Sequence, residues 1–100
     1  MQMKCAAAFV AVLAVSMFAG CSEVSNREDF ASQISHKTER EVERFAGKPA
    51  SVDSADPNRV IWIYKGRTFD VPTRKTDPET DVVFSRAADG KLHVVDVVFK

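Results

Sequence analysis

The sequence has no excess of charge of either sign, because 14 lysine and arginine residues balance 14 aspartate and glutamate residues. Proteins that bind nucleic acid usually carry a basic surface, so this balance argues against a nucleic-acid partner. Glycine is scarce as well. The four glycines are scattered along the chain, at Gly20, Gly47, Gly66 and Gly90, which excludes a glycine-rich loop for binding phosphate. With 100 residues, the chain is long enough for one domain at most.

Residues that commonly carry catalysis or bind metals are also few. The two histidines, His36 and His93, have no neighbouring His, Cys or carboxylate at the spacing of a metal site. We expect His36 to be solvated in a turn and His93 to be packed in a strand. No nucleophile elbow and no convergent acid and base can be named. The sequence therefore predicts a protein that is not an enzyme and has no metal, cofactor or small-molecule substrate.

A long apolar run is missing too. The stretch without charge, Ala6 to Phe18, is shorter than the roughly 20 residues that a membrane-spanning helix needs. It follows the basic residue Lys4 and leads into the small residues Ala19 and Gly20. A basic start, a short apolar middle and a small-residue end are typical of a secretory signal. We therefore predict that this segment directs export and is removed.

The end of this segment, Phe18-Ala19-Gly20-Cys21, resembles the lipobox of bacterial lipoproteins, although Phe18 stands where leucine is usual. The resemblance implies a signal peptide at residues 1–20, cleavage before Cys21, lipid on Cys21 and a tether at residues 21–25. Ordinary secretion with a free thiol is the alternative. Ser22 replaces the aspartate that retains many lipoproteins in the inner membrane. The resemblance thus implies an outer-membrane anchor and a domain that faces the periplasm.

Cysteine usage agrees with this interpretation. Cys5 would be removed and Cys21 would carry lipid, so the mature domain would have no disulfide and would depend on its core. The five residue steps from Cys21 to Asn26 span at most about 18 Å. We therefore expect the domain to stay close to the bilayer that holds the lipid.

Two short helices are predicted at the start of the domain. Ser25 and Glu28 fit a capping box, as do Thr38 and Glu41, and Gly47 would end the second helix. Both helices are too short to be stable alone, so they must pack on another element. Each carries one apolar stripe. The stripe of the first helix is Phe30, Ala31 and Ile34, and that of the second is Val42, Phe45 and Ala46.

Three strands are predicted to follow, at Val60–Tyr64, Asp81–Arg86 and Leu92–Phe99. The Asp89-Gly90 pair predicts a tight turn between the last two strands. We expect the polar stretches 50–59 and 65–81 to be loops, although Thr68 to Val71 could prolong the first strand. The sequence therefore predicts an α+β domain at residues 26–100. Its two short N-terminal helices would pack on one face of a three-stranded antiparallel β-meander.

The last strand indicates where a partner could bind. Strict alternation would place Leu92, Val94, Asp96 and Val98 on one face. Two short helices cover only one face of a sheet, so one apolar row would stay partly exposed and could bind a partner. Trp62 and Tyr64 share a face of the first strand and could add aromatic contacts. The alternatives are that the 65–81 loop covers this row or that the chain pairs with itself.

Several short motifs resemble the SmpA/OmlA domain, the BamE-like family of outer-membrane lipoproteins. They are Thr38-x-x-x-Val42, the corner Phe45-Ala46-Gly47-Lys48-Pro49, Trp62-x-Tyr64, Val82-x-Phe84 and the hairpin around Asp89-Gly90-Lys91-Leu92. The likeness runs roughly from Asn26 to Phe99, whereas His36-Lys37 departs from the family's usual Gly-Met pair. It implies a lipid anchor in the outer membrane. It also implies a non-catalytic adaptor or scaffold that binds an envelope protein, in β-barrel assembly or envelope maintenance. The alternative is an inhibitor or exclusion-type lipoprotein that blocks an enzyme or a transfer apparatus.

Overall fold

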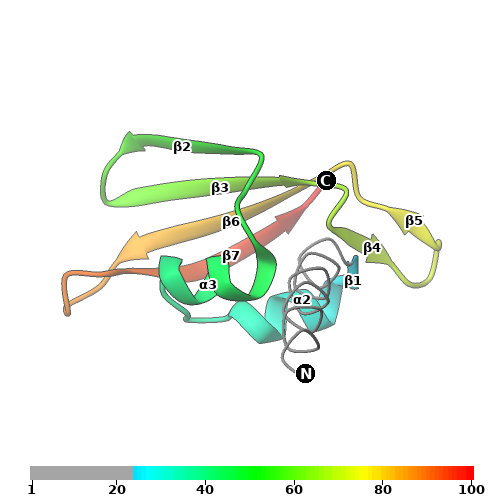
Figure 1. Cartoon of the computed structure of the whole chain (residues 1–100), viewed down its shortest axis with the longest axis horizontal. Coiled ribbons are helices and arrows are strands. Elements are labelled where there is room, and N and C mark those ends of the chain that lie inside the picture. Colours follow the sequence, from blue (N-terminus) through cyan, green and yellow to red (C-terminus); the bar gives the residue numbers. More distant parts are fainter. Residues whose placement is uncertain (1–23) are drawn as a thin grey trace, which may run out of the picture.

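The computed structural model describes residues 24–100, which form two helices and two separate β-sheets (Figure 1). In chain order the elements are β1 (Ser25–Asn26), α2 (Arg27–Ile34), α3 (Glu39–Ala46), β2 (Ser51–Asp56), β3 (Arg59–Lys65), β4 (Thr68–Asp70), β5 (Lys75–Thr76), β6 (Glu79–Arg86) and β7 (Leu92–Phe99). One sheet has the order β2–β3–β6–β7 and the other β1–β4–β5. The predicted ααβββ domain with a single three-stranded meander is therefore wrong. The predicted signal peptide and the lipid site at Cys21 lie outside the described residues.

The large sheet has a fourth strand, β2, in the polar stretch 50–59 that was expected to be a loop, and this strand is exposed along its whole length. It forms because a turn at Pro57-Asn58 returns the chain antiparallel to β3, with Ser51 opposite Ile63 and Asp53 opposite Ile61. A register shift between Asp53 and Asp56 distorts this pairing. Polar edge strands of this kind resist pairing with other chains.

The small sheet lies in the stretch that was expected to be a long loop. Gly66, with φ 58°, turns the chain after β3, so Thr68 to Asp70 does not prolong that strand. This segment becomes β4 instead and pairs in parallel with β1, Ser25 with Thr68 and Asn26 with Phe69. In Figure 1 the small sheet lies beside the C-terminus, and the turn between β6 and β7 lies at the opposite end of the molecule.

Side-chain caps define where the helices begin. The predicted cap at Ser25 is wrong by one residue, because Asn26 Oδ1 accepts from the Asp29 backbone amide at 2.8 Å. The predicted box at α3 is confirmed: Thr38 accepts from the Glu41 amide, and Glu41 accepts from the Thr38 amide. Gly47, with φ 82°, ends this helix as expected.

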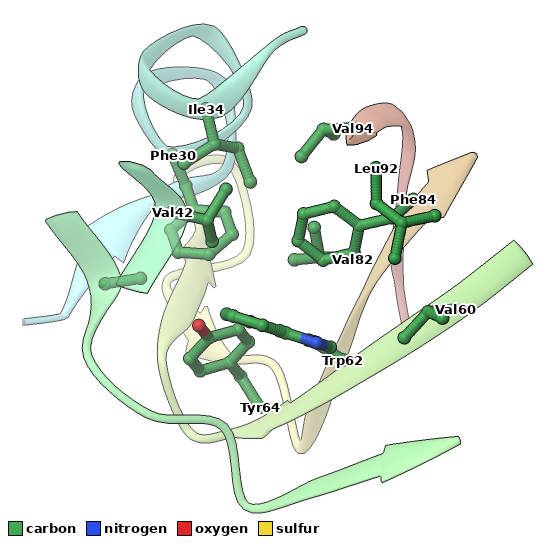
Figure 2. Packing of buried hydrophobic residues seen from close by; sticks show 11 residues of the cluster. Phe30, Ile34, Val42, Val60, Trp62, Tyr64, Val82, Phe84, Leu92 and Val94 are labelled. Atoms are coloured by element: carbon green, nitrogen blue, oxygen red, sulfur yellow. The ribbon is translucent and has the colours of Figure 1, made fainter. Parts of the chain in front are cut away.

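Both helices pack on one face of the four-stranded sheet, and the core fills the space between them (Figure 2). The predicted stripes largely supply the helical part of the core. The buried residues that form this core are Phe30, Ile34, Val42, Ala46, Val60, Trp62, Tyr64, Val82, Phe84, Leu92 and Val94. Phe30 of α2 meets Tyr64 of β3 edge-on, with ring centroids 6.0 Å apart, and so joins the helices to the sheet. Within the sheet, the ring centroids of Trp62 and Phe84 are 4.9 Å apart.

A β-bulge changes the sidedness of the last strand. Val83 pairs with Asp96 and Phe84 pairs with Val94, so Val95 is an extra residue without a partner. The bulge moves the core-facing positions from Leu92 and Val94 to Val97 and Phe99, which both pack against the core. The predicted single face of Leu92, Val94, Asp96 and Val98 is therefore wrong.

Candidate functional site

The structure does not bring together the six residues that were predicted to bind a partner. Trp62, Tyr64, Leu92 and Val94 are between 3% and 8% exposed and lie in the core beneath the helices (Figure 2). The Tyr64 hydroxyl donates to the Gly47 carbonyl oxygen at 2.8 Å, and burial raises the pKa of this phenol. The remaining two residues, Asp96 and Val98, are exposed and lie on the opposite face of the sheet.

That opposite face carries an apolar surface that we call the outer-face patch, formed by Ile61, Ile63, Asp81, Val83 and Val98. Ile61 lies directly across from Val83, and Asp81 lies between Ile63 and Val98 on the two neighbouring strands. Val98 is 38% exposed, the two isoleucines are half-buried and Val83 is buried. Both helices pack on the other face, so neither of them covers this patch. Exposed aliphatic clusters of this kind often mark binding surfaces.

A carboxylate sits inside this apolar surface. Asp81 is only 8% exposed, and its Oδ2 accepts from Lys100 Nζ at 2.9 Å. Its Oδ1 is buried, and no donor among residues 24–100 reaches it. A buried polar atom without a partner costs about 1–3 kcal/mol. The patch therefore holds a largely buried carboxylate whose charge is balanced at Oδ2 by Lys100.

Lysines surround the acidic residues at this end of the sheet. Glu79 accepts from Lys65 Nζ at 3.1 Å and from Lys100 Nζ at 3.3 Å. The interaction with the neighbouring Asp81 carboxyl, followed by the hydrogen bonds from the two lysines, lowers the pKa of Glu79 to about 2. Glu79 therefore stays ionised over the whole physiological range, and it keeps both lysine ammonium groups near the rim of the patch.

Sequence reasoning missed Ile61, Ile63 and Val83, although the sequence carries a signal for them. Residues 60–64 are all apolar, and a strand that alternates its side chains between two faces then has both faces apolar. Only one of those faces is needed for the core. The same argument applies to 82–84, so the patch could have been placed on β3 and β6 rather than on the last strand.

The histidine that was predicted to be packed in a strand has a structural role at the far end of the sheet. His93 Nδ1 lies 2.8 Å from the His36 carbonyl oxygen, and its Nε2 lies 2.8 Å from Asp89 Oδ2. The bond to the His36 backbone, and then that to Asp89, raises the pKa of His93. The ring thus joins the corner between the two helices to the turn between β6 and β7.

A hollow of about 410 Å³ lies nearby, lined by Thr38, Arg40, Arg86, Lys91 and neighbouring residues. The Arg86 guanidinium has a structural role, because it donates to the carbonyls of Pro57 and Gly90 and to the Asn58 side chain.

Within residues 24–100, no group of three His, Cys, Asp or Glu side chains is placed to hold a metal ion. In the same part of the chain, no helix is both long and apolar enough to span a membrane.

Comparisons with protein-family models, with curated proteins and with solved structures find no match to this chain. The described residues therefore define the chain only as a small, mostly β domain with two helices and two sheets.

Proposed function

We propose that this chain is a small lipid-anchored envelope protein that acts as a non-catalytic adaptor and holds a partner protein against its outer-face patch. The observation that carries the proposal is the position of Ile61, Ile63, Val83 and Val98 on the face opposite both helices. These residues are not needed to cover the helices, yet they place aliphatic side chains on three neighbouring strands around Asp81.

The patch also indicates the chemistry of the partner. Exposed carboxylates border it, because Asp53 lies opposite Ile61 and Asp96 lies opposite Val83. A partner with aliphatic side chains beside an arginine or lysine would bury the aliphatic side chains of the patch and pair with one of these carboxylates. Removal of either partner of such a desolvated charge pair typically costs about 2–5 kcal/mol of binding.

The lipid anchor is the other half of the proposal. It rests on Cys21 at the end of a sequence typical of exported lipoproteins and on the short connection to Ser25, where the described fold begins. A Cys21→Ala chain should not incorporate labelled fatty acid. It should be recovered as uncleaved precursor or as released protein. Normal labelling of that variant would contradict the anchor without bearing on the patch.

Site-specific photocrosslinking tests the patch. A photoreactive phenylalanine analogue at Val98 should crosslink one envelope protein in intact cells, through a peptide that contains a lysine or arginine. Asp96→Asn should weaken that crosslink at least tenfold. The matched control is Val52, a valine of similar exposure (50%) on β2, where no comparable crosslink is expected.

The identity of the crosslinked protein would decide between the candidate roles. A crosslink to a component of β-barrel assembly would support an assembly adaptor, and a crosslink to an enzyme or transfer protein would support an inhibitor. Equal crosslinking from Val98 and Val52 would contradict the proposal that the patch binds a partner. Circular dichroism of each variant would establish that the fold is retained.

A further inference from the structure

The start of the described chain is fastened to the small sheet rather than to the large one. The Ser25 amide donates to the Arg67 carbonyl oxygen at 3.1 Å, and Arg67 Nη1 donates to Ser25 Oγ at the same distance. Two residues later, the Arg27 guanidinium donates to Asp77 beyond β5. The segment that precedes Ser25 is therefore connected directly to the small sheet.

The hairpin between β4 and β5 presents an unusual surface at this end of the molecule. We call Phe69, Val71, Arg74 and Lys75 the hairpin tip. Val71 is 51% exposed, Phe69 is half-buried, and Arg74 joins them around a hollow of about 300 Å³. Apolar side chains beside a guanidinium are suited to a phospholipid interface, where acyl chains and phosphates lie next to each other.

The electrostatic balance of the tip is positive. Asp70 accepts from Thr73 Oγ1 at 2.7 Å and lies 3.8 Å from Arg27, while Asp77 is held by the same arginine at 2.6 Å. Arg27 thus balances one of these two negative charges. The exposed side chains of Arg74 and Lys75 add two positive charges, so the net charge at the tip remains positive.

We infer that the hairpin tip rests in the anionic headgroup layer of the membrane that holds the lipid anchor, with Val71 inserted and Arg74 and Lys75 on phosphates. This inference rests on the proposed lipid at Cys21. The four residue steps from Cys21 to Ser25 span at most about 14 Å. Val71 lies only three residues beyond Thr68, the residue paired with Ser25. Because β1 and β4 run parallel, the chain ahead of Ser25 leaves away from the tip. The shortness of the tether and of the step from Thr68 to Val71 would nevertheless keep the anchor and the hairpin tip within reach of one membrane surface.

The size of the effect follows from the charges. Each lysine or arginine close to an anionic bilayer contributes about 1 kcal/mol, which is roughly a fivefold change in an equilibrium constant. Arg74→Gln together with Lys75→Gln should therefore lower the docking constant of the hairpin roughly 30-fold. The lipid would supply most of the attachment, and the tip would fix which way the domain faces.

Depth-dependent fluorescence quenching tests this inference on the lipidated protein reconstituted into vesicles. Val71→Cys would carry an environment-sensitive fluorophore, and lipids with a spin label near the headgroup would act as quenchers. The controls are Val52→Cys and Val95→Cys, because these valines have matched exposures of 50% and 55% on the large sheet. Lipid on Cys21 and removal of Cys5 would leave the introduced thiol as the one labelling site.

We expect strong quenching at position 71 and little at positions 52 and 95 when phosphatidylglycerol is present. The quenching should fall in pure phosphatidylcholine and in the Arg74→Gln/Lys75→Gln variant. Equal quenching at all three positions would overturn the inference. So would quenching at position 71 that stays the same both in pure phosphatidylcholine and in the Arg74→Gln/Lys75→Gln variant.

Mass spectrometry of Cys21 separates the two proposals. An unmodified cysteine would contradict the lipid anchor, and with it this inference. A lipidated protein with an unquenched hairpin would contradict this inference alone.

Discussion

Arg27 and Asp77, fifty residues apart in the chain, form a two-pronged ion pair, with Nη2 2.6 Å from Oδ1 and Nε 3.1 Å from Oδ2. Asp77 is only 4% exposed and also accepts from Thr68 Oγ1 at 2.7 Å. The pair joins the first residue of α2 to the segment that follows β5. It therefore fixes the helical layer to the small sheet.

The first prediction concerns this pair. Asp77→Asn should lower the free energy of unfolding by about 2 kcal/mol at neutral pH, because it weakens a buried charge-assisted bond. The bond from Arg27 lowers the pKa of Asp77, so its stabilisation is present above the ordinary carboxyl pKa and is lost as the pH falls through the folded value. The unfolding free energies of wild type and variant, measured in urea, should converge as the pH falls below the ordinary carboxyl pKa value of 3.8. Glu28→Gln, an exposed change in the same helix, is the control and should have almost no effect.

The second prediction concerns the end of α3. Tyr64→Phe removes the donor of the Gly47 carbonyl and should cost about 1 kcal/mol without loss of the core packing. Gly47→Ala should cost more than this, because a φ of 82° is strained for any residue with a Cβ. Thermal unfolding of the two variants would measure both effects. A neutral Gly47→Ala would mean that the helix does not end in this conformation.

The third prediction concerns His93. Both ring nitrogens face acceptors, the His36 carbonyl and the Asp89 carboxylate, and a ring can donate to both only when it is protonated. The pKa of His93 is raised, so its stabilisation is fully present below the unfolded value of about 6.5 and is lost as the pH rises through the folded value. Stability should therefore decline as the pH rises above about 6.5. His93→Gln should remove that slope, and an unchanged slope would contradict the assignment.

The fourth prediction separates the two faces of β7. Val97→Asp should destabilise the fold strongly, because this residue packs against the core and the charge would be buried. Val98→Asp should change the free energy of unfolding by less than about 1 kcal/mol, because Val98 is 38% exposed on the outer face. Urea unfolding of the pair tests the bulge at Val95. Without the bulge, the order of the two effects would be reversed.

The parts of the fold that the sequence predicts are those encoded by short-range patterns. The apolar spacing of Phe30 and Ile34, the capping box at Thr38, and the β-branched and aromatic run at 60–64 each specify an element locally. The small sheet has no such pattern. Its strands are two or three residues long, and the Ser25–Thr68 pairing joins residues that are distant in sequence. Its presence depends on tertiary contacts that the sequence does not display.

The candidate site was only partly predictable for a related reason. A single extra residue at Val95 reverses which side chains face the core, and nothing in Val94-Val95-Asp96-Val97-Val98 shows which valine is the extra one. Alternation alone therefore placed Leu92 and Val94 on the binding face. The run of apolar residues at 60–64 did contain the correct information, because it makes both faces of β3 apolar.

The short parallel pairing of β1 with β4 also determines how the domain would respond to a mechanical load. A pull applied ahead of Ser25 runs along the axis of β1, so it loads the bonds to Arg67 and the Arg27–Asp77 pair together, in shear. Bonds loaded in parallel share the force, whereas a helix pulled from its end unravels one turn at a time. The small sheet therefore shields α2 and the core behind it from tension on the chain.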